Sequence, residues 1–237
     1  MTNESRPGTT HEASLPLDVL STHCPEPLPR PLAPHTLHDL RGGVIVELRY
    51  PRSATLIVAG VPGAGKSTAL ARLFGATADA ETPPDGPDGC LVLDSHQARN
   101  RWRRRLSWLP YLLRRPVVHT AHFLAIRTAL REATGAVVIH DCATFRWTRA
   151  LIAHWAGRYG RDLHLLMLDV PASVARAGQQ ARGRRVNRVA FAAHARRWRR
   201  LMRTVTTEQR GPTGGWCSVV IVDRTTIDRL RRVAFAA

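Results

Sequence analysis

The stretch Gly60-Val61-Pro62-Gly63-Ala64-Gly65-Lys66-Ser67-Thr68 decides how this chain folds. It follows an apolar run at Ala54–Ala59 and leads into a helical pattern at Ser67–Phe74. The stretch fits G-x-x-x-x-G-K-[ST], a glycine-rich loop that joins a strand to a helix. Glycines let the backbone wrap around a phosphate, and the loop amides and the helix N-terminus supply donors and positive potential. The sequence therefore predicts a phosphate-binding P-loop.

Two side chains of this loop have expected roles of their own. Lys66 should contact the β and γ phosphates of ATP, and Ser67 should place its hydroxyl on Mg²⁺. Lys66 is also the single lysine of a chain with 35 basic Lys and Arg residues. The residues expected to hold the nucleotide are Gly60, Gly63, Ala64, Gly65, Lys66, Ser67 and Thr68.

Short, continuous apolar runs recur along the rest of the chain and alternate with helical patterns. Such runs are typical of a parallel sheet that is covered on both faces. They lie at residues 90–93, 136–140, 163–168 and 218–222. This order predicts a doubly wound, three-layer α/β sandwich with its ligand site beyond the carboxyl ends of the strands. A further run at Val44–Leu48, with a turn at residues 51–53, predicts a short N-terminal hairpin extension.

Length and composition favour one folded domain with an appendage. Residues 1–37 are rich in proline and predict a disordered arm, and residues 38–237 of the 237 are expected to form a nucleotide-binding domain. A net charge of +17 points to anionic partners, and it leaves nucleic acid as a candidate partner. The four cysteines lack metal-ligand spacing, which favours a reducing cytoplasm, and no apolar stretch is long enough for a membrane span.

Carboxylates that follow the predicted strands are the candidate catalytic groups. Asp94 follows the run at 90–93 and could accept a proton from a substrate hydroxyl, while Arg99, one turn later, could clamp an anionic substrate. The alternative for Asp94 is a helix cap. Asp141 follows the run at 136–140 and resembles a Walker-B carboxylate that helps to hold Mg²⁺.

Arginine-rich segments suggest further contacts with phosphates. Arg182 and Arg185 lie in a basic turn between two predicted helices and could close over a triphosphate as a lid. Two other runs, at residues 99–105 and 196–200, combine arginine with tryptophan and allow a nucleic-acid interpretation.

With these residues in place, the chain resembles the small P-loop kinases related to polynucleotide kinase, zeta toxin and gluconate kinase. It is also similar to actinobacterial ATP-binding proteins of the AAA family in that clan. The resemblance covers residues from about 44 to 222. It implies a mainly parallel five-stranded sheet, ATP with Mg²⁺ as the phosphoryl donor, and a lid arginine over the phosphates.

The chain departs from that resemblance at one position. Polynucleotide kinase has an Asp three residues before its substrate-clamping Arg, and the corresponding residue here is His96, before Arg99. Either Asp94 or His96 then serves as the base, or only nucleotide binding remains. The leading hypothesis is transfer of the γ-phosphoryl group to a hydroxyl of a nucleoside, sugar, small molecule or polynucleotide end. A nucleotide-dependent nucleic-acid-binding or regulatory ATPase and a nucleotide-stabilised scaffold are the alternatives. The acceptor and the oligomeric state stay open.

Overall fold

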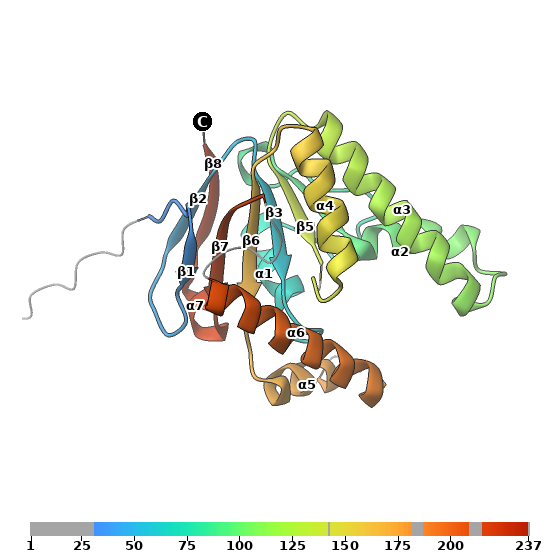
Figure 1. Cartoon of the computed structure of the whole chain (residues 1–237). Helices are drawn as coiled ribbons and strands as arrows, with labels where there is room; N and C mark the ends of the chain where they lie inside the picture. The colour runs from blue at the N-terminus through green and yellow to red at the C-terminus, as the bar shows by residue number, and fades with distance from the viewer. Residues whose placement is uncertain (1–30, 142, 182–186, 209–214, 237) are drawn as a thin grey trace, which may run out of the picture.

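A computed structural model of the chain describes residues 31–141, 143–181, 187–208 and 215–236. The central feature is a sheet of six parallel strands in the order β1-β7-β6-β3-β5-β4 (Figure 1). The six strands are β1 (Leu37–Asp39), β3 (Thr55–Ala59), β4 (Leu91–Asp94), β5 (Val137–His140), β6 (Leu163–Leu168) and β7 (Trp216–Val222). All residues of β3 and β6 are buried, as expected for the middle of a sheet with helices on both faces.

Helices connect successive strands and cover both faces of the sheet. In Figure 1, α4 and α6 lie in front of the sheet and α1 lies behind it, while α2 and α3 extend away from the β4 edge. The helices are α1 (Lys66–Phe74), α2 (Ser95–Arg105), α3 (Tyr111–Glu132), α4 (Arg146–Arg158), α5 (Ala172–Gln180), α6 (Arg188–Glu208) and α7 (Arg224–Arg229), with a 3₁₀ turn η1 (Pro87–Gly89). The prediction of a three-layer α/β sandwich is therefore confirmed. Within the described residues, no helix has the length and apolar character to cross a membrane.

The predicted N-terminal hairpin is wrong. Strand β2 (Glu47–Pro51) does not pair with β3 but forms a separate, parallel two-stranded sheet with β8 (Arg232–Ala236). Leu48 lies opposite Val233, and both side chains are fully buried. The strand alternates between buried and exposed positions, so one of its faces packs on the core, and its edge pairs with a strand from far along the chain.

The expected five-stranded sheet also gains a sixth strand. Strand β1 is three residues long and pairs with β7, with Leu37 opposite Val219. Upstream of it, Leu32 forms a β-bridge with Leu48. Described structure thus starts before residue 38, where the folded domain was expected to begin. The rest of the predicted arm, residues 1–30, lies outside the described residues.

A buried histidine between β6 and β7 makes stability depend on pH. His164 is 3% exposed, its Nδ1 lies 2.8 Å from Ser218 Oγ, and its ring lies edge-on against Tyr50. Burial lowers the pKa of His164 to about 4. An unfolded histidine titrates near pH 6.5. The unfolded chain therefore takes up the proton first on acidification, and stability that is complete above about pH 6.5 declines toward pH 4.

We expect the melting temperature of the wild-type protein to fall between pH 6.5 and 4.5. The double variant His164→Leu/Ser218→Ala removes both polar partners and should show a smaller fall over the same range. Calorimetry at several pH values measures both. Equal falls in the two proteins would place the acid sensitivity in other groups, such as His122, whose pKa burial also lowers to about 4.

Candidate active site

The glycine-rich loop between β3 and α1 adopts a backbone that only glycine allows at two positions. Gly63 has a φ of 91° and Gly65 a φ of 107°, both in the left-handed region. A Cβ on Gly63 would lie 2.0 Å from the Ala175 carbonyl oxygen of α5. A Cβ on Gly65 would lie 2.5 Å from a guanidinium nitrogen of Arg224. The loop is therefore packed against α5 on one side and faces an arginine on the other.

Lys66 is held at the centre of this loop. Its side chain is buried, and Nζ donates to the carbonyl oxygens of Gly60 at 2.6 Å and Val61 at 3.1 Å. The ladder of α1 starts where Ala69 N–H donates to Gly65, so the backbone amides of the first turn lie at the N-terminal end of the helix. Ser67 and Thr68 are exposed on that turn. The loop thus combines a cation, helix-terminal amides and exposed hydroxyls, as binding of a nucleotide phosphate requires.

Asp94 and His140 form a buried pair at the carboxyl ends of two adjacent strands. They are register partners on β4 and β5, and Asp94 Oδ2 lies 2.8 Å from His140 Nδ1. Asp94 Oδ1 also accepts the backbone N–H of His96 at 2.9 Å. Burial by itself would raise the pKa of Asp94, but the hydrogen bonds from His140 and His96 outweigh it and hold that pKa well below its usual value. Asp94 is therefore an ionised carboxylate with a fixed orientation.

Asp141 lies one residue beyond this pair, beside the strand that leads into the P-loop. Its backbone N–H donates to Val58 of β3 at 3.3 Å, and Thr148 Oγ1 donates to its carboxylate at 3.2 Å. No group of three or more His, Cys, Asp or Glu in the described residues could hold a metal ion by itself. Oxygen donors from Asp141 and Ser67 nevertheless suit Mg²⁺, which usually binds one or two protein oxygens together with substrate phosphates. The residues present therefore fit a nucleotide-bound magnesium.

Helix α6 adds residues to the site that the sequence did not indicate. His194 Nδ1 lies 2.8 Å from Thr144 Oγ1, and the Arg197 guanidinium lies 4.7 Å from the centre of the Phe145 ring. Burial, followed by the positive charges of Arg197 and Lys66, lowers the pKa of His194. The effect of Lys66 shows that this part of α6 lies near the P-loop. No local motif marks His194, and Arg197 was indicated only as part of the basic run at residues 196–200, because the contacts of both depend on how α6 packs.

Helix α3 brings two histidines toward the same carboxylates. His122 is buried, and burial lowers its pKa although Asp141 and Asp94 act in the opposite direction. Burial and then the charges of Arg115 and Arg99 lower the pKa of His119. Of these two histidines, His122 is thus the one whose pKa responds to the Asp94–His140 pair.

The structure places the predicted site residues as follows. The P-loop, Asp94 and Asp141 all lie at the carboxyl edge of the parallel sheet. Asp94 accepts the N–H of His96 in the first turn of α2, so the alternative of a helix cap is also realised. Arg99 is exposed on α2. The predicted lid residues, Arg182 and Arg185, lie outside the described residues.

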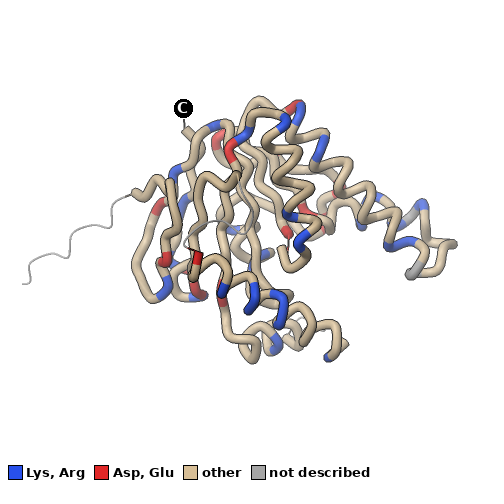
Figure 2. Tube along the Cα trace, in the orientation of Figure 1, with Lys and Arg blue, Asp and Glu red and all other residues tan. Residues whose placement is uncertain are grey.

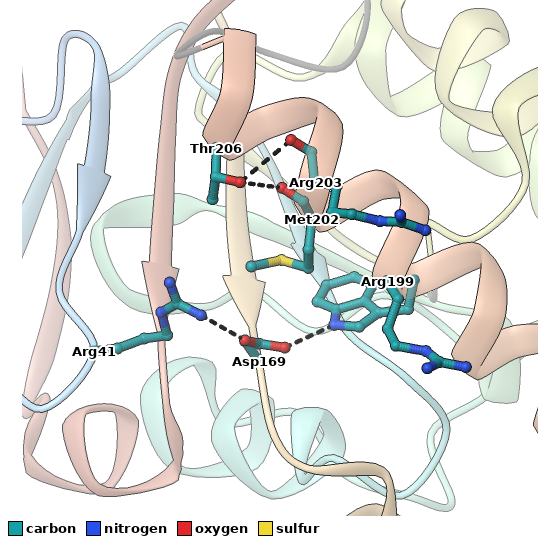
Figure 3. Close-up of a pocket in the computed structure, with 7 residues that line it drawn as sticks. Arg41, Asp169, Arg199, Met202, Arg203 and Thr206 are labelled. Carbon is teal, nitrogen blue, oxygen red and sulfur yellow. Dashed lines mark hydrogen bonds and ion pairs between the residues drawn. The ribbon is translucent and has the colours of Figure 1, made fainter.

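A second hollow, of about 500 Å³, lies between α6 and the end of β6 (Figure 3). Asp169 at its floor forms an ion pair with Arg41 at 2.9 Å and accepts Trp198 Nε1 at 2.9 Å. These partners join α6 to the segment after β1. The hollow is therefore a structural junction, separate from the P-loop residues.

The loop, its buried lysine and its place between a central strand and a helix define a P-loop nucleotide-binding protein. The model of the AAA domain family matches residues 56–207, and the chain belongs to that family. A comparison with curated proteins found no match.

Solved structures with a similar fold include a candidate kinase from Chloroflexus aurantiacus, at 18% identity and a TM-score of 0.47, over 76% of this chain and 90% of that chain. A gluconokinase from Sinorhizobium meliloti is also 18% identical, with a TM-score of 0.42, over 76% of this chain and 89% of that one.

Proposed function

We propose that this protein is an ATP-dependent kinase that transfers the γ-phosphoryl group to a hydroxyl of its acceptor. The observation that carries the proposal is the carboxylate of Asp94, which lies 2.8 Å from His140 Nδ1 at the same sheet edge as the P-loop. A P-loop by itself does not distinguish a protein that only binds ATP from one that hydrolyses it or one that transfers its phosphoryl group. A buried carboxylate that a neighbouring imidazole holds in place adds the group that an acceptor hydroxyl needs.

In this mechanism Lys66 leaves the carbonyls of Gly60 and Val61 and donates to the β and γ phosphates, with the loop amides beside it. The acceptor oxygen forms a bond to the γ phosphorus, the bond from that phosphorus to the β–γ bridging oxygen breaks, and Asp94 takes the acceptor's hydroxyl proton. ADP is the leaving group. Mg²⁺, held through Ser67 and Asp141, would neutralise charge on the phosphates. Arg99 orients an anionic acceptor, and Arg182 and Arg185 are the proposed lid.

Two further assignments go with this proposal. Cys90 and Cys217 are free thiols in the described residues, which supports action in a reducing cytoplasm. The acceptor side of the site carries arginines on α2 and α3, which favours an acceptor with negative charge near its hydroxyl.

Transfer of label tests the proposed reaction. The protein is incubated with γ-labelled ATP and Mg²⁺ against nucleosides, sugars and oligonucleotides with a free 5′-hydroxyl, and the products are separated. A labelled acceptor is the expected result. Release of labelled phosphate with every acceptor would identify a hydrolase instead, and ATP binding without any product would identify a scaffold.

The pair with His140 leads to a prediction about pH. In a His140→Ala variant the burial of Asp94 is no longer offset by the imidazole, so the pKa of the carboxyl rises. Because the base must be ionised, the acid limb of the profile of kcat/KM against pH should move upward by at least about one unit. A His140→Gln variant, which keeps a donor, should move less. If the acid limb lies at the same pH in the wild-type protein and in both variants, His140 is not the group that positions Asp94.

A further inference from the structure

The strongest feature outside the proposed site is the charge of the α2–α3 hairpin. From Ser95 to Arg131 the chain contains nine arginines and no aspartate or glutamate. Figure 2 shows basic positions along both helices, where they extend from the sheet. Exposed arginines without nearby carboxylates produce a positive potential that attracts polyanions.

The base of the hairpin is anchored, so its charged surface has a defined position. Asn100 Nδ2 donates to the carbonyl oxygens of Ala78 at 2.9 Å and Ala80 at 3.1 Å. Arg101 Nε donates to the Glu81 carbonyl at 3.1 Å. Helix α2 is thus fixed against the segment before β4, and its far end projects.

Two arginines and a tryptophan form a stripe along this projection. Arg101 and Arg105 are exposed and lie one turn apart on the same side of α2, about 6 Å along its axis. Trp108, which is 76% exposed, follows the helix and donates from Nε1 to the Arg105 carbonyl at 3.1 Å. The guanidinium of Arg105 lies 5.8 Å from the centre of the Trp102 ring. We call Arg101, Arg105 and Trp108 the α2 stripe.

Basic groups that follow a backbone beside an exposed aromatic ring are the elements with which proteins hold single-stranded nucleic acid. The arginines contact phosphates, and the ring stacks on an unpaired base whatever its identity. An acidic protein could bind the arginines, but it would give the Trp108 ring no base to stack on. In a duplex the bases are already stacked on one another and cannot stack on the ring. We propose that the α2 stripe binds a single-stranded polynucleotide through its phosphates and one stacked base.

The position of the α2 stripe relates oligonucleotide binding to the proposed reaction. Helix α2 starts at Ser95, directly after Asp94, so a strand bound along the stripe would lie on the same continuous segment of chain as the proposed base. The end of that strand would then be the acceptor of the phosphoryl group. This last step rests on the proposed function, whereas the binding itself does not.

Fluorescence anisotropy with labelled 20-nucleotide DNA and RNA oligonucleotides bearing a 5′-hydroxyl tests the stripe. For the double variant Arg101→Gln/Arg105→Gln we expect the Kd to rise at least about tenfold, and the slope of log K against log salt to fall by about 1.4, since each single-strand phosphate contact contributes about 0.7. Trp108→Ala should weaken binding by about tenfold while leaving the salt slope unchanged. Melting curves confirm that each variant is folded.

The matched control is Arg52→Gln/Arg229→Gln, which removes the same charge from exposed positions near the β2–β8 sheet. Equal weakening by the control would show that net charge alone drives binding and would overturn the proposal. Equal binding of a DNA duplex or of polyglutamate, or no binding of single strands at low salt, would also overturn it. A Lys66→Met variant should lose ATP binding and keep oligonucleotide binding, so failure of the stripe and failure of the proposed kinase are distinguishable.

Discussion

A Lys66→Met variant should bind ATP at least about 100-fold more weakly than the wild-type protein, because two charge-assisted hydrogen bonds to phosphate are each worth about 1.5–3 kcal/mol. Methionine keeps most of the buried stem of the side chain and removes the ammonium that now donates to Gly60 and Val61. Isothermal titration with a non-hydrolysable ATP analogue and Mg²⁺ measures the effect.

The control is Arg52→Gln, which removes one exposed positive charge before β3, at the end of that strand away from the P-loop. It should leave nucleotide affinity within about twofold, because exposed charges beyond a Debye length of about 8 Å are largely screened. An unchanged affinity in folded Lys66→Met would refute the assignment of the P-loop as the nucleotide site.

The second large effect is expected for Asp94→Asn. The amide has the same shape as the carboxylate but cannot take a full proton, and a general base contributes about 10²–10⁴-fold to a rate. We expect phosphoryl transfer to fall at least about 100-fold, while ATP affinity stays unchanged because Asp94 does not belong to the loop. Once an acceptor has been found, turnover with labelled ATP measures the rate of phosphoryl transfer. Isothermal titration measures the ATP affinity.

Asp169→Asn provides a matched control. Asp169 follows β6 at the same edge of the sheet but is occupied by Arg41 and Trp198. This variant should lose some thermal stability and retain turnover. If Asp94→Asn retains near-normal turnover, Asp94 is not the base, and His96 becomes the next candidate.

The sequence was sufficient for the central part of the fold, because the signals there are local. The P-loop spacing, the wholly apolar run of β3 and the short runs of the other central strands each identify an element from its own residues. In the site, Asp94 and Asp141 could be predicted because each directly follows such a run.

The features that the sequence did not reveal depend on distant pairing. Strand β2 alternates and precedes a turn, which is also the pattern of a hairpin strand, and nothing near it indicates β8 as its partner. The contact between Asp94 and His140 requires β4 and β5 to be neighbours in one register. His194 lies near the P-loop, and Arg197 lies over the Phe145 ring, only through the packing of α6. Pro116 lies inside α3, beyond its first turn, where proline normally indicates a break, so the sequence could not place that helix boundary.

The pairing of β2 with β8 also affects how the chain folds while it is being synthesised. Ribosomes deliver Glu47–Pro51 early and Arg232–Ala236 only after some 180 further residues. During that interval the edge of the early strand that later faces β8 is unpaired, because the bridge from Leu32 uses the backbone groups of Glu47 and Arg49 on the opposite edge. The nucleotide-binding half can assemble while synthesis continues, but the β2 edge stays open to other chains until β8 emerges. Chaperones that shield unpaired strands would act on the β2 edge during that interval.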